Sequence, residues 1–401
     1  MTSTSDVRPP ATPARPTGSG RRMAGLDGIR GLAALFVVVH HCYLSAFPGY
    51  PRATGPWWTG WMIYGHLAVV VFIVLSGFSL AVGPARHGWR LDGLGRYAHR
   101  RAWRILSAYW PALAFSLVMA WVFVPQPGEA APNGRSVAVY GLLLQDVVGS
   151  PSPNGAFWSI AIEAQLYVLL PILLILARRR GLIAMLLAVT VPVLVVGVFA
   201  ASVPAIGLFT RFTPQLATGF AVGVLAAGLV TDRRWQRVRF GWLAVAAAVP
   251  PLALIAATGS VWTVAHYFWV DLSVMPAIAL LLVGLGRGGA PATSRLLEFA
   301  PVRHLGAFSY SLYLIHAPVV VALAAVVVRR WTGPGLAGLL VMLALAVPLS
   351  LAVSRLFAAF FDLPFQRHKS WGALSQAVHD RLIGARTKKI TVHLPHLGER
   401  H

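Results

Sequence analysis

The chain has 401 residues, of which 57% are hydrophobic and 11% charged, and its formal net charge is +22. Soluble domains carry about 25% charged residues, so this composition excludes an ordinary soluble protein and is typical of a polytopic membrane protein. The positive charge does not indicate nucleic-acid binding, because the Lys and Arg residues lie in short clusters between long apolar runs, as in cytoplasmic membrane loops.

The N-terminal segment, residues 1–22, is rich in Pro, Thr, Ser, Gly and Arg, and we expect a disordered, basic cytoplasmic tail. It lacks the features of a signal peptide, because the apolar run starts late and no small-residue cleavage site precedes a soluble domain. Cys42 is the only cysteine, so a disulfide within the chain is impossible and a cysteine metal cluster is not expected. The bias towards Ala, Val, Arg and Gly favours a GC-rich, bacterial genome.

Ten segments are apolar and roughly 20 residues long, which is the length that a membrane-spanning helix requires. They cover residues 26–47, 66–83, 102–124, 157–177, 181–203, 208–230, 240–257, 264–285, 304–328 and 334–361. We therefore predict an all-α, polytopic membrane protein with about ten transmembrane helices, which form one membrane domain over residues 23–365.

The basic clusters test this count independently, because Lys and Arg concentrate in cytoplasmic loops. They precede the first span and follow every even-numbered span: Arg21 and Arg22; Arg86, Arg90, Arg96, Arg100 and Arg101; Arg178, Arg179 and Arg180; Arg233, Arg234, Arg237 and Arg239; Arg287, Arg295 and Arg303; Arg367 and Lys369. The opposite loops carry few: Arg52, Arg135, Arg329 and Arg330. Both termini are therefore predicted to be cytoplasmic, and one helix more or fewer would break the alternation.

Two segments outside the spans have a distinct composition. Residues 125–156 are rich in Pro, Gly, Ser and Asn, and this longest external loop is a candidate for contact with an external substrate. Residues 366–401 predict a basic cytoplasmic tail, in which apolar residues recur at near-helical spacing over 371–385. That spacing predicts a short amphipathic helix on the inner leaflet, and we expect no appended soluble domain.

The first predicted span begins with LDGIRGLAALFVVVHH, which carries ionisable residues that lipid disfavours. Arg30 and His41 are eleven residues apart, close to three helical turns, so they share one face with Asp27 near it, while His40 points away. Ionisable groups aligned on a membrane helix usually line an interior path or site. A buried imidazole can serve as a general base, and the alternative for His41 is a structural hydrogen bond to a neighbouring helix.

A polar stripe of Ser159, Glu163 and Tyr167 recurs at i, i+4 and i+8 on the predicted span 157–177. Glu163 lies about as far below the predicted outer surface as His41, so contact between them is permitted. A carboxylate beside an imidazole would hold the ring and stabilise its protonated form. The alternative for Glu163 is a structural pair with Arg211.

Two arginines, Arg101 and Arg104, are i, i+3 neighbours at the cytoplasmic start of the third span. Two guanidinium groups on one face suit a bidentate hold on phosphate. The alternative is that both only follow the positive-inside rule.

The predicted span 304–328 carries Ser309, Tyr313 and His316 on one face, and Pro318 is positioned to kink the helix beyond them. These side chains are further candidates for an interior site. Three other ionisable residues lie near the predicted outer surface without an assigned role: His66, His266 and Asp271.

Five sequence blocks together resemble, in order, those of the acyltransferase-3 family of membrane O-acyltransferases, which modify surface polysaccharides and some natural products. The blocks are LDGIRGLAALFVVVHH at 26–41, VLSGF at 74–78, RAWRI at 101–105, FWSIAIEAQLY at 157–167 and LGAFSYSLYLIHAP at 305–318. The family's spacing between an arginine and its catalytic histidine selects His41 rather than His40. The departures are Val70 where an acid is common, Ser107 where proline is common, and DLPF at 362–365; we expect none of them to touch the site.

The resemblance implies a standalone O-acyltransferase that moves an acyl group, most simply acetyl, from acyl-CoA to a hydroxyl of a surface glycan or a secondary metabolite. His41 would be the general base or a transient acyl carrier, Glu163 would orient it or balance its charge, and Arg30 would hold the donor or stabilise transition-state charge. Arg101 and Arg104 would hold the phosphates of cytoplasmic acyl-CoA. The supporting residues would be Asp27, Trp158, Ser159, Tyr167, Ser309, Tyr310, Tyr313 and His316.

The expected location is the cell membrane, with acetyl-CoA as co-substrate and with no metal, bound cofactor, nucleic acid or protein partner. A rival hypothesis is a proton-coupled transporter that uses the His, Glu and Asp side chains as a relay. Transporters often contain paired inverted repeats, and the first block has no counterpart in residues 200–361. A third hypothesis is an inactive, acyl-binding relative.

Overall fold

The computed structural model describes residues 23, 25–368, 370, 372, 375 and 376. All regular structure in these residues is helical, which confirms the all-α prediction. The tail predicted over residues 1–22 lies outside the described residues, and so does the amphipathic helix predicted over 371–385, apart from residues 372, 375 and 376.

Nine helices in the described part of the chain are long and apolar enough to cross a membrane. They are α1 (Leu26–Ala46), α2 (His66–Arg86), α3 (Leu94–Val122), α5 (Trp158–Arg180), α6 (Leu182–Phe199), α9 (Phe240–Ala265), α10 (Tyr267–Gly286), α13 (Ser309–Val326) with η4 (Val327–Thr332), and α14 (Leu336–Phe361). A tenth span arises if α7 (Pro204–Gly207) and η2 (Leu208–Phe212) are joined with α8 (Gln215–Thr231). This agrees with the predicted number of spans, whereas the side of the membrane on which each terminus lies stays a prediction.

Two predicted spans are wrong as continuous helices. The span predicted over 208–230 bends by 54° between η2 and α8. Thr213 has a left-handed backbone (φ 45°) at the bend, and Pro214 disfavours a helical conformation of the residue before it. The span predicted over 304–328 divides at Phe308 (φ −123°) into α12 (Ala300–Ala307) and α13.

Close contacts between helices hold the bundle together. Gly77 of α2 faces the backbone of α8, and Gly223 of α8 faces the backbone of α2, so a side chain at either position would collide with the other helix. Gly31 of α1 meets the backbone of Gly306 in α12 in the same way. Small residues at such contacts let membrane helices approach closely.

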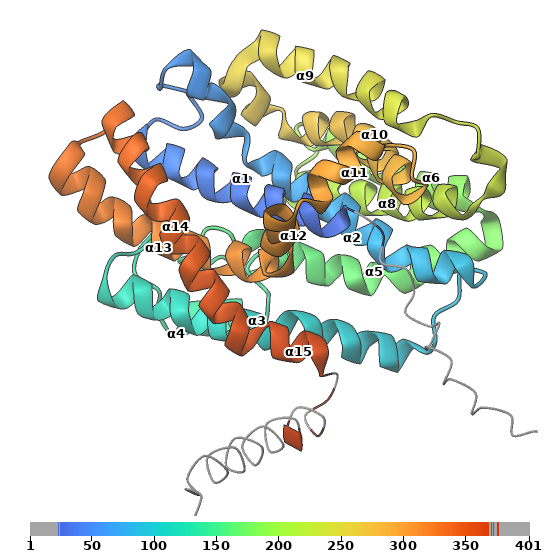
Figure 1. The fold of residues 1–401 in the computed structure, drawn as a ribbon, viewed down its shortest axis with the longest axis horizontal. Helices are drawn as coiled ribbons and strands as arrows, with labels where there is room; N and C mark the ends of the chain where they lie inside the picture. Colours follow the sequence, from blue (N-terminus) through green and yellow to red (C-terminus); the bar gives the residue numbers. More distant parts are fainter. Residues whose placement is uncertain (1–22, 24, 369, 371, 373–374, 377–401) are drawn as a thin grey trace, which may run out of the picture.

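The long helices run side by side, with α9 along one edge and α3 with α4 (Gly134–Gly141) along the opposite edge (Figure 1). Between these edges, α1 packs against α2, α12, α13 and α14, so the helix that carries Arg30 and His41 lies in the interior. The remaining short helices are η1 (Trp57–Tyr64), η3 (Arg233–Trp235) and α11 (Pro291–Glu298) in the connections, and α15 (Leu363–Arg367) after α14.

The loop over 125–156 is held on the bundle by α13. Pro318 lies inside α13, which continues through it, and Pro318 has no N–H to donate to the carbonyl of Leu314 four residues earlier. Asn154 Nδ2 donates instead to that carbonyl at 2.8 Å, and it also donates to Ser116 Oγ of α3 at 3.0 Å. The carbonyl that proline frees therefore anchors the end of the loop to the helix that carries His316.

Candidate active site

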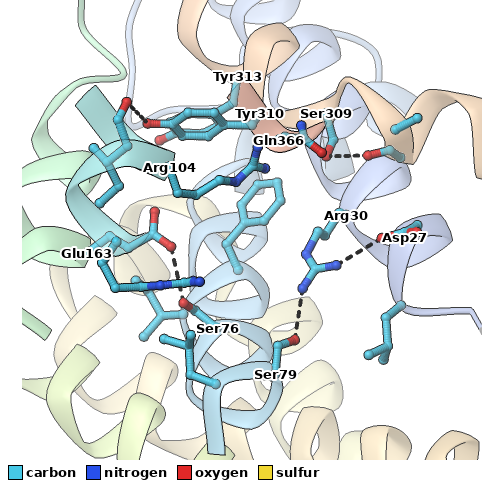
Figure 2. Close-up of a pocket in the computed structure, with 18 of the residues that line it drawn as sticks. Asp27, Arg30, Ser76, Ser79, Arg104, Glu163, Ser309, Tyr310, Tyr313 and Gln366 are labelled. Atoms are coloured by element: carbon cyan, nitrogen blue, oxygen red, sulfur yellow. Dashed lines mark hydrogen bonds and ion pairs between the residues drawn. The ribbon is translucent and has the colours of Figure 1, made fainter. Parts of the chain in front are cut away.

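A cavity of about 980 Å³ lies among α1, α2, α3, α5 and α13. Figure 2 shows that side chains from these helices point into one space. Ten predicted site residues line it: Asp27, Arg30, Arg101, Arg104, Ser159, Glu163, Tyr167, Ser309, Tyr310 and Tyr313. Three do not: His41, Trp158 and His316. The predicted site therefore divides into a cavity and a separate group of histidines.

The cavity has a strong excess of positive charge. Two acids line it, Asp27 and Glu163, against six arginines: Arg30, Arg86, Arg101, Arg104, Arg303 and Arg367. Guanidinium groups present paired N–H donors that match phosphate and carboxylate oxygens. The cavity therefore fits a large ligand with several anionic groups.

Arg30 is held in place by two neighbours on the cavity wall. Its Nη1 donates to Asp27 Oδ1 at 3.0 Å, and its Nη2 donates to Ser79 Oγ of α2 at 2.8 Å (Figure 2). The prediction that Asp27 and Arg30 share a face of α1 is thus confirmed. The Arg30 side chain is 32% exposed, so the fixed guanidinium is still open to a ligand.

The two arginines of the RxxR pair have different partners. The Cζ atom of Arg101 lies 5.9 Å from the centre of the Tyr167 ring, and that of Arg104 lies 5.2 Å from the centre of the Tyr310 ring, so both make cation–π contacts. Arg104 Nη1 also donates to Asp362 Oδ1 at 2.7 Å. Arg101 has no carboxylate partner among the residues that the structure describes, so its charge is the less compensated of the two.

The prediction that residues 362–365 stay away from the site is wrong. The buried Asp362 carboxylate accepts from Arg104, from Ser311 Oγ at 3.0 Å and from Gln366 Nε2 at 2.9 Å. Leu363 and Gln366 themselves line the cavity. Asp362 is 258 positions from Arg104 in the chain, so no local pattern in the sequence could pair them.

Glu163 is held inside the cavity by hydroxyl groups. Tyr167 Oη donates to Glu163 Oε1 at 2.6 Å, and Ser76 Oγ of α2 donates to the same oxygen at 3.2 Å. The predicted stripe on α5 is thus confirmed in part, because Tyr167 bonds to Glu163 one turn away. Within the described residues, Glu163 contacts neither His41 nor Arg211, the two partners considered from the sequence.

Tyr313 forms the wall between the cavity and the histidines. Its hydroxyl lies 2.7 Å from Ser159 Oγ and donates to the carbonyl of Ala156 at 3.1 Å. Its ring lines the cavity and has its centre 5.8 Å from that of His316. The predicted face of Ser159 and Tyr313 therefore joins α5 to α13 at this wall.

Beyond Tyr313, three imidazole rings lie in a row. The ring centres of His41 and His316 are 5.0 Å apart, and those of His40 and His41 are 5.2 Å apart. His316 is fully buried, and His41 is half-buried. The structure therefore brings His41 of α1 against His316 of α13, a contact between residues that the sequence placed in separate motifs.

A fourth histidine, His66 of α2, belongs to a separate hydrogen-bonded group. His66 Nε2 lies 2.9 Å from Asp271 Oδ2, and Gln215 Nε2 donates to the same carboxylate at 3.1 Å. The His66 ring stacks on Tyr267 at 4.1 Å and on Trp158 at 5.6 Å between ring centres. This gives a role to Asp271, which the sequence left unassigned, because it ties α2, α8 and α10 together.

Comparison with known proteins identifies the class. The model of an acyltransferase domain (Acyl_transf_3) matches residues 23–355. The peptidoglycan O-acetyltransferase OatA of Listeria monocytogenes is 24% identical over 331 residues, which cover 75% of this chain and 50% of OatA. BcsY of Komagataeibacter xylinus is 26% identical over 350 residues, which cover 80% of this chain and 79% of BcsY. BcsY carries the provisional name of membrane-bound transacylase.

The O-acetyltransferase OatA of Staphylococcus aureus (strain NCTC 8325 / PS 47) is 22% identical over 357 residues, which cover 76% of this chain and 51% of the relative. The chain thus spans about half the length of the OatA proteins and most of BcsY. No solved structure matches the chain.

Proposed function

The chain belongs to the acyltransferase family whose domain model it matches, and from that membership we propose that it transfers an acetyl group from acetyl-CoA to a hydroxyl group of a glycan. As a member of this family it is a multi-pass membrane protein.

The observation that carries the proposal is the arginine-rich cavity of about 980 Å³. Coenzyme A has several phosphate groups at one end and a long arm with the thioester at the other. Arg101 and Arg104 of α3 would bind the phosphates, and Arg30 of α1 would hold the donor within the cavity.

The donor would enter from the cytoplasm. Arg86, Arg303 and Arg367 line the cavity and belong to the clusters that the positive-inside rule places on the cytoplasmic side. Acyl-CoA is a cytoplasmic metabolite, so the charge of the cavity and the side of entry agree. The same rule would place both termini in the cytoplasm.

His41 would act as the general base. The hydroxyl oxygen attacks the thioester carbon while His41 takes the hydroxyl proton, the C–S bond breaks, and the proton passes from His41 to the sulfur. The products are the ester and free coenzyme A. About 17 Å along α1 separates Arg30 from His41, so the arm of the donor would extend past Tyr313 to bring the thioester to His41.

Glu163 would act within the cavity. Its carboxylate is held by Ser76 and Tyr167, so it is fixed among the arginines and would balance their charge while the donor is absent. Of the other supporting residues, Ser159 and Tyr313 would shape the passage between the cavity and His41.

The names of the relatives support the proposed acceptor class. The Listeria relative is named a peptidoglycan O-acetyltransferase, and a hydroxyl of a surface glycan is the corresponding acceptor for this chain. Deletion of the gene tests this directly: mass spectrometry of surface glycans and secreted metabolites should show the loss of one acetyl group per modified unit. If the glycans keep their mass and a secreted metabolite loses an acetyl group, the acceptor is that metabolite and not a glycan. No mass change in either would contradict the proposal.

The donor site is tested by binding of coenzyme A to the protein in lipid nanodiscs. Arg101→Ala should weaken affinity about tenfold or more, because one charge-assisted contact to phosphate is lost. The matched control is Arg211→Ala, which removes an exposed arginine outside the cavity and should leave the affinity unchanged. Equal affinities of wild type and Arg101→Ala would contradict the assignment, and proton flux without acyl-CoA would favour the transporter hypothesis.

A further inference from the structure

A histidine base needs a partner that fixes its proton. An imidazole accepts a proton through one ring nitrogen only when the other nitrogen carries the hydrogen, and an acceptor beside that N–H decides which nitrogen is which. Glu163, the partner expected from the sequence, is bonded to Ser76 and Tyr167 instead. The His41 ring makes no hydrogen bond within the described part of the chain, and the aromatic rings that pair with it there are those of His40 and His316.

His316 offers such an acceptor. Its Nδ1 lies 2.8 Å from the carbonyl of Tyr313 and 3.1 Å from that of Leu312. A carbonyl can only accept, so Nδ1 carries the hydrogen and Nε2 of the neutral ring presents a lone pair. This Nε2 atom is buried and has no hydrogen-bond partner within the described residues.

An unpartnered acceptor of this kind is unusual, because buried polar atoms in proteins are nearly always hydrogen-bonded. The His316 side chain is fully buried, so water does not compensate for the missing partner. The imidazole of His41 is the polar group whose ring centre lies 5.0 Å away. Within the described residues, His316 therefore lacks a donor to its Nε2 atom and His41 lacks an acceptor for its ring N–H, and the two rings are neighbours.

His40 resembles His316 in part and serves as the comparison. Its ring centre lies 5.2 Å from that of His41, and its Nδ1 lies 3.0 Å from the carbonyl of Met62. It differs in that its ring is not fully buried and lies against Gly65. Of these two neighbours of His41, His316 alone has a buried nitrogen without a hydrogen-bond partner among the described residues.

We propose that His316 Nε2 accepts a hydrogen bond from the ring N–H of His41 and so directs the opposite nitrogen of His41 to the acceptor hydroxyl, an inference that rests on the function proposed above. A rotation of the His41 ring closes this bond, and catalytic hydrogen bonds often tighten only when substrate is bound. His316 keeps its own proton on Nδ1 throughout, and the hydroxyl proton still passes from His41 to the sulfur. His316 is thus a positioning residue.

The surroundings hold His316 rigidly enough for this role. Tyr313, three residues earlier on α13, is fixed by Ser159 and Ala156, and Leu314 is fixed by Asn154. These bonds tie Tyr313 and Leu314, in the helical turn before His316, to α5 and to the loop that precedes α5. A group that positions a base has to be locked in this way by its own surroundings.

The kinetic test compares two substitutions of His316 with one of His40. In His316→Asn the amide can still donate near the Nδ1 position but nothing replaces Nε2, whereas in His316→Gln the longer amide reaches the Nε2 position. We expect kcat to fall about 100-fold in His316→Asn and to recover in part in His316→Gln. KM for acetyl-CoA should stay unchanged in both, because His316 does not line the cavity. His40→Asn should keep kcat within a few-fold of wild type.

The second readout does not depend on activity. The protein is labelled with nitrogen-15 histidine in lipid bilayers, and the His41 signals are identified by their loss in His41→Ala. One His41 nitrogen should be protonated in wild type and in His40→Asn, and the proton should be shared between both nitrogens in His316→Asn. A His41 spectrum unchanged by His316→Asn, or kcat unchanged in that variant, would overturn the proposal.

These measurements distinguish a failure of the proposed function from a failure of the role of His316. A dependence of the His41 spectrum on His316 without acyl transfer in the wild type would support the contact and refute the proposed function. Acyl transfer in the wild type with a spectrum and a kcat that ignore His316 would support the function and refute the role of His316. Loss of coenzyme A binding and of thermal stability together in His316→Asn and His316→Gln would mean that His316 is only structural, which also overturns the proposal.

Discussion

The ion pair between Arg104 and Asp362 predicts that the two arginines of the RxxR pair differ in their effect on folding. Asp362 is 1% exposed, and its carboxylate depends on Arg104 for a charged donor at 2.7 Å. Arg104→Ala leaves that buried carboxylate with only neutral donors. Arg101→Ala removes a cation that has no carboxylate partner among the described residues, so it leaves no buried charge behind.

The magnitude follows from the exposure of the pair. Removal of one partner of a fully buried ion pair costs about 3–5 kcal/mol, and a hydrogen bond to a charged group contributes about 1.5–3 kcal/mol. The Arg104 side chain is 35% exposed, so water can reach part of the vacated space. We therefore expect Arg104→Ala to lower the free energy of unfolding by about 2–3 kcal/mol. Arg101→Ala should lower it by less than about 1 kcal/mol.

The assay is reversible unfolding in detergent micelles, followed by the fluorescence of the tryptophans, together with coenzyme A binding. A double-mutant cycle with Asp362→Asn isolates the pair, and the coupling energy should account for most of the Arg104→Ala effect. Both arginine variants should weaken coenzyme A binding. Equal stability of the two variants, or a coupling energy near zero, would refute the reasoning.

Three further predictions concern groups around the site. Asn154→Ala should lower the free energy of unfolding by about 1–3 kcal/mol, because it leaves the carbonyl of Leu314 without a donor; thermal unfolding measures this loss. Asp271→Ala should lower the free energy of unfolding by about 3 kcal/mol. Asp271→Asn should lower it by less, because the amide oxygen of asparagine can still accept from His66 or Gln215; equal losses in the two variants would contradict this. Burial raises the pKa of the Asp146 carboxyl to about 6, so between about pH 4 and 6 the folded chain holds a proton that the unfolded chain releases. Stability should therefore fall as the pH rises through this window, and Asp146→Asn should remove that dependence.

The spans were predictable because each depends on one local property. A run of about 20 apolar residues has to satisfy its own backbone as a helix in lipid, and basic residues mark the ends. The bend at Thr213 was missed because hydropathy is insensitive to backbone conformation, although Pro214 was a visible signal. The separate α12 was missed for the same reason.

Within single helices the site was also predictable. The spacing of Asp27 and Arg30 on α1, and of Glu163 and Tyr167 on α5, fixes which side chains meet one turn apart. Ser76 was missed although its block was recognised, because its hydroxyl acts across helices on Glu163.

Contacts between helices were not predictable from spacing. Equal depth permitted His41 to meet Glu163, but the rotation of α5 turns that carboxylate towards α2 and into the cavity. The ring that does meet His41 is His316 of α13, and the acid that meets Arg104 is Asp362 at the end of α14. Such pairings depend on how the helices pack, which a single sequence does not determine.

The most direct measurement of the central claim is transfer of radiolabelled acetyl from acetyl-CoA to the glycans of membranes that contain the chain, compared between wild type and His41→Ala. Alkali-labile label should accumulate with wild type and be absent with His41→Ala, while both proteins bind coenzyme A with equal affinity, because His41 lies outside the cavity. Transfer by His41→Ala at the wild-type rate would contradict the account.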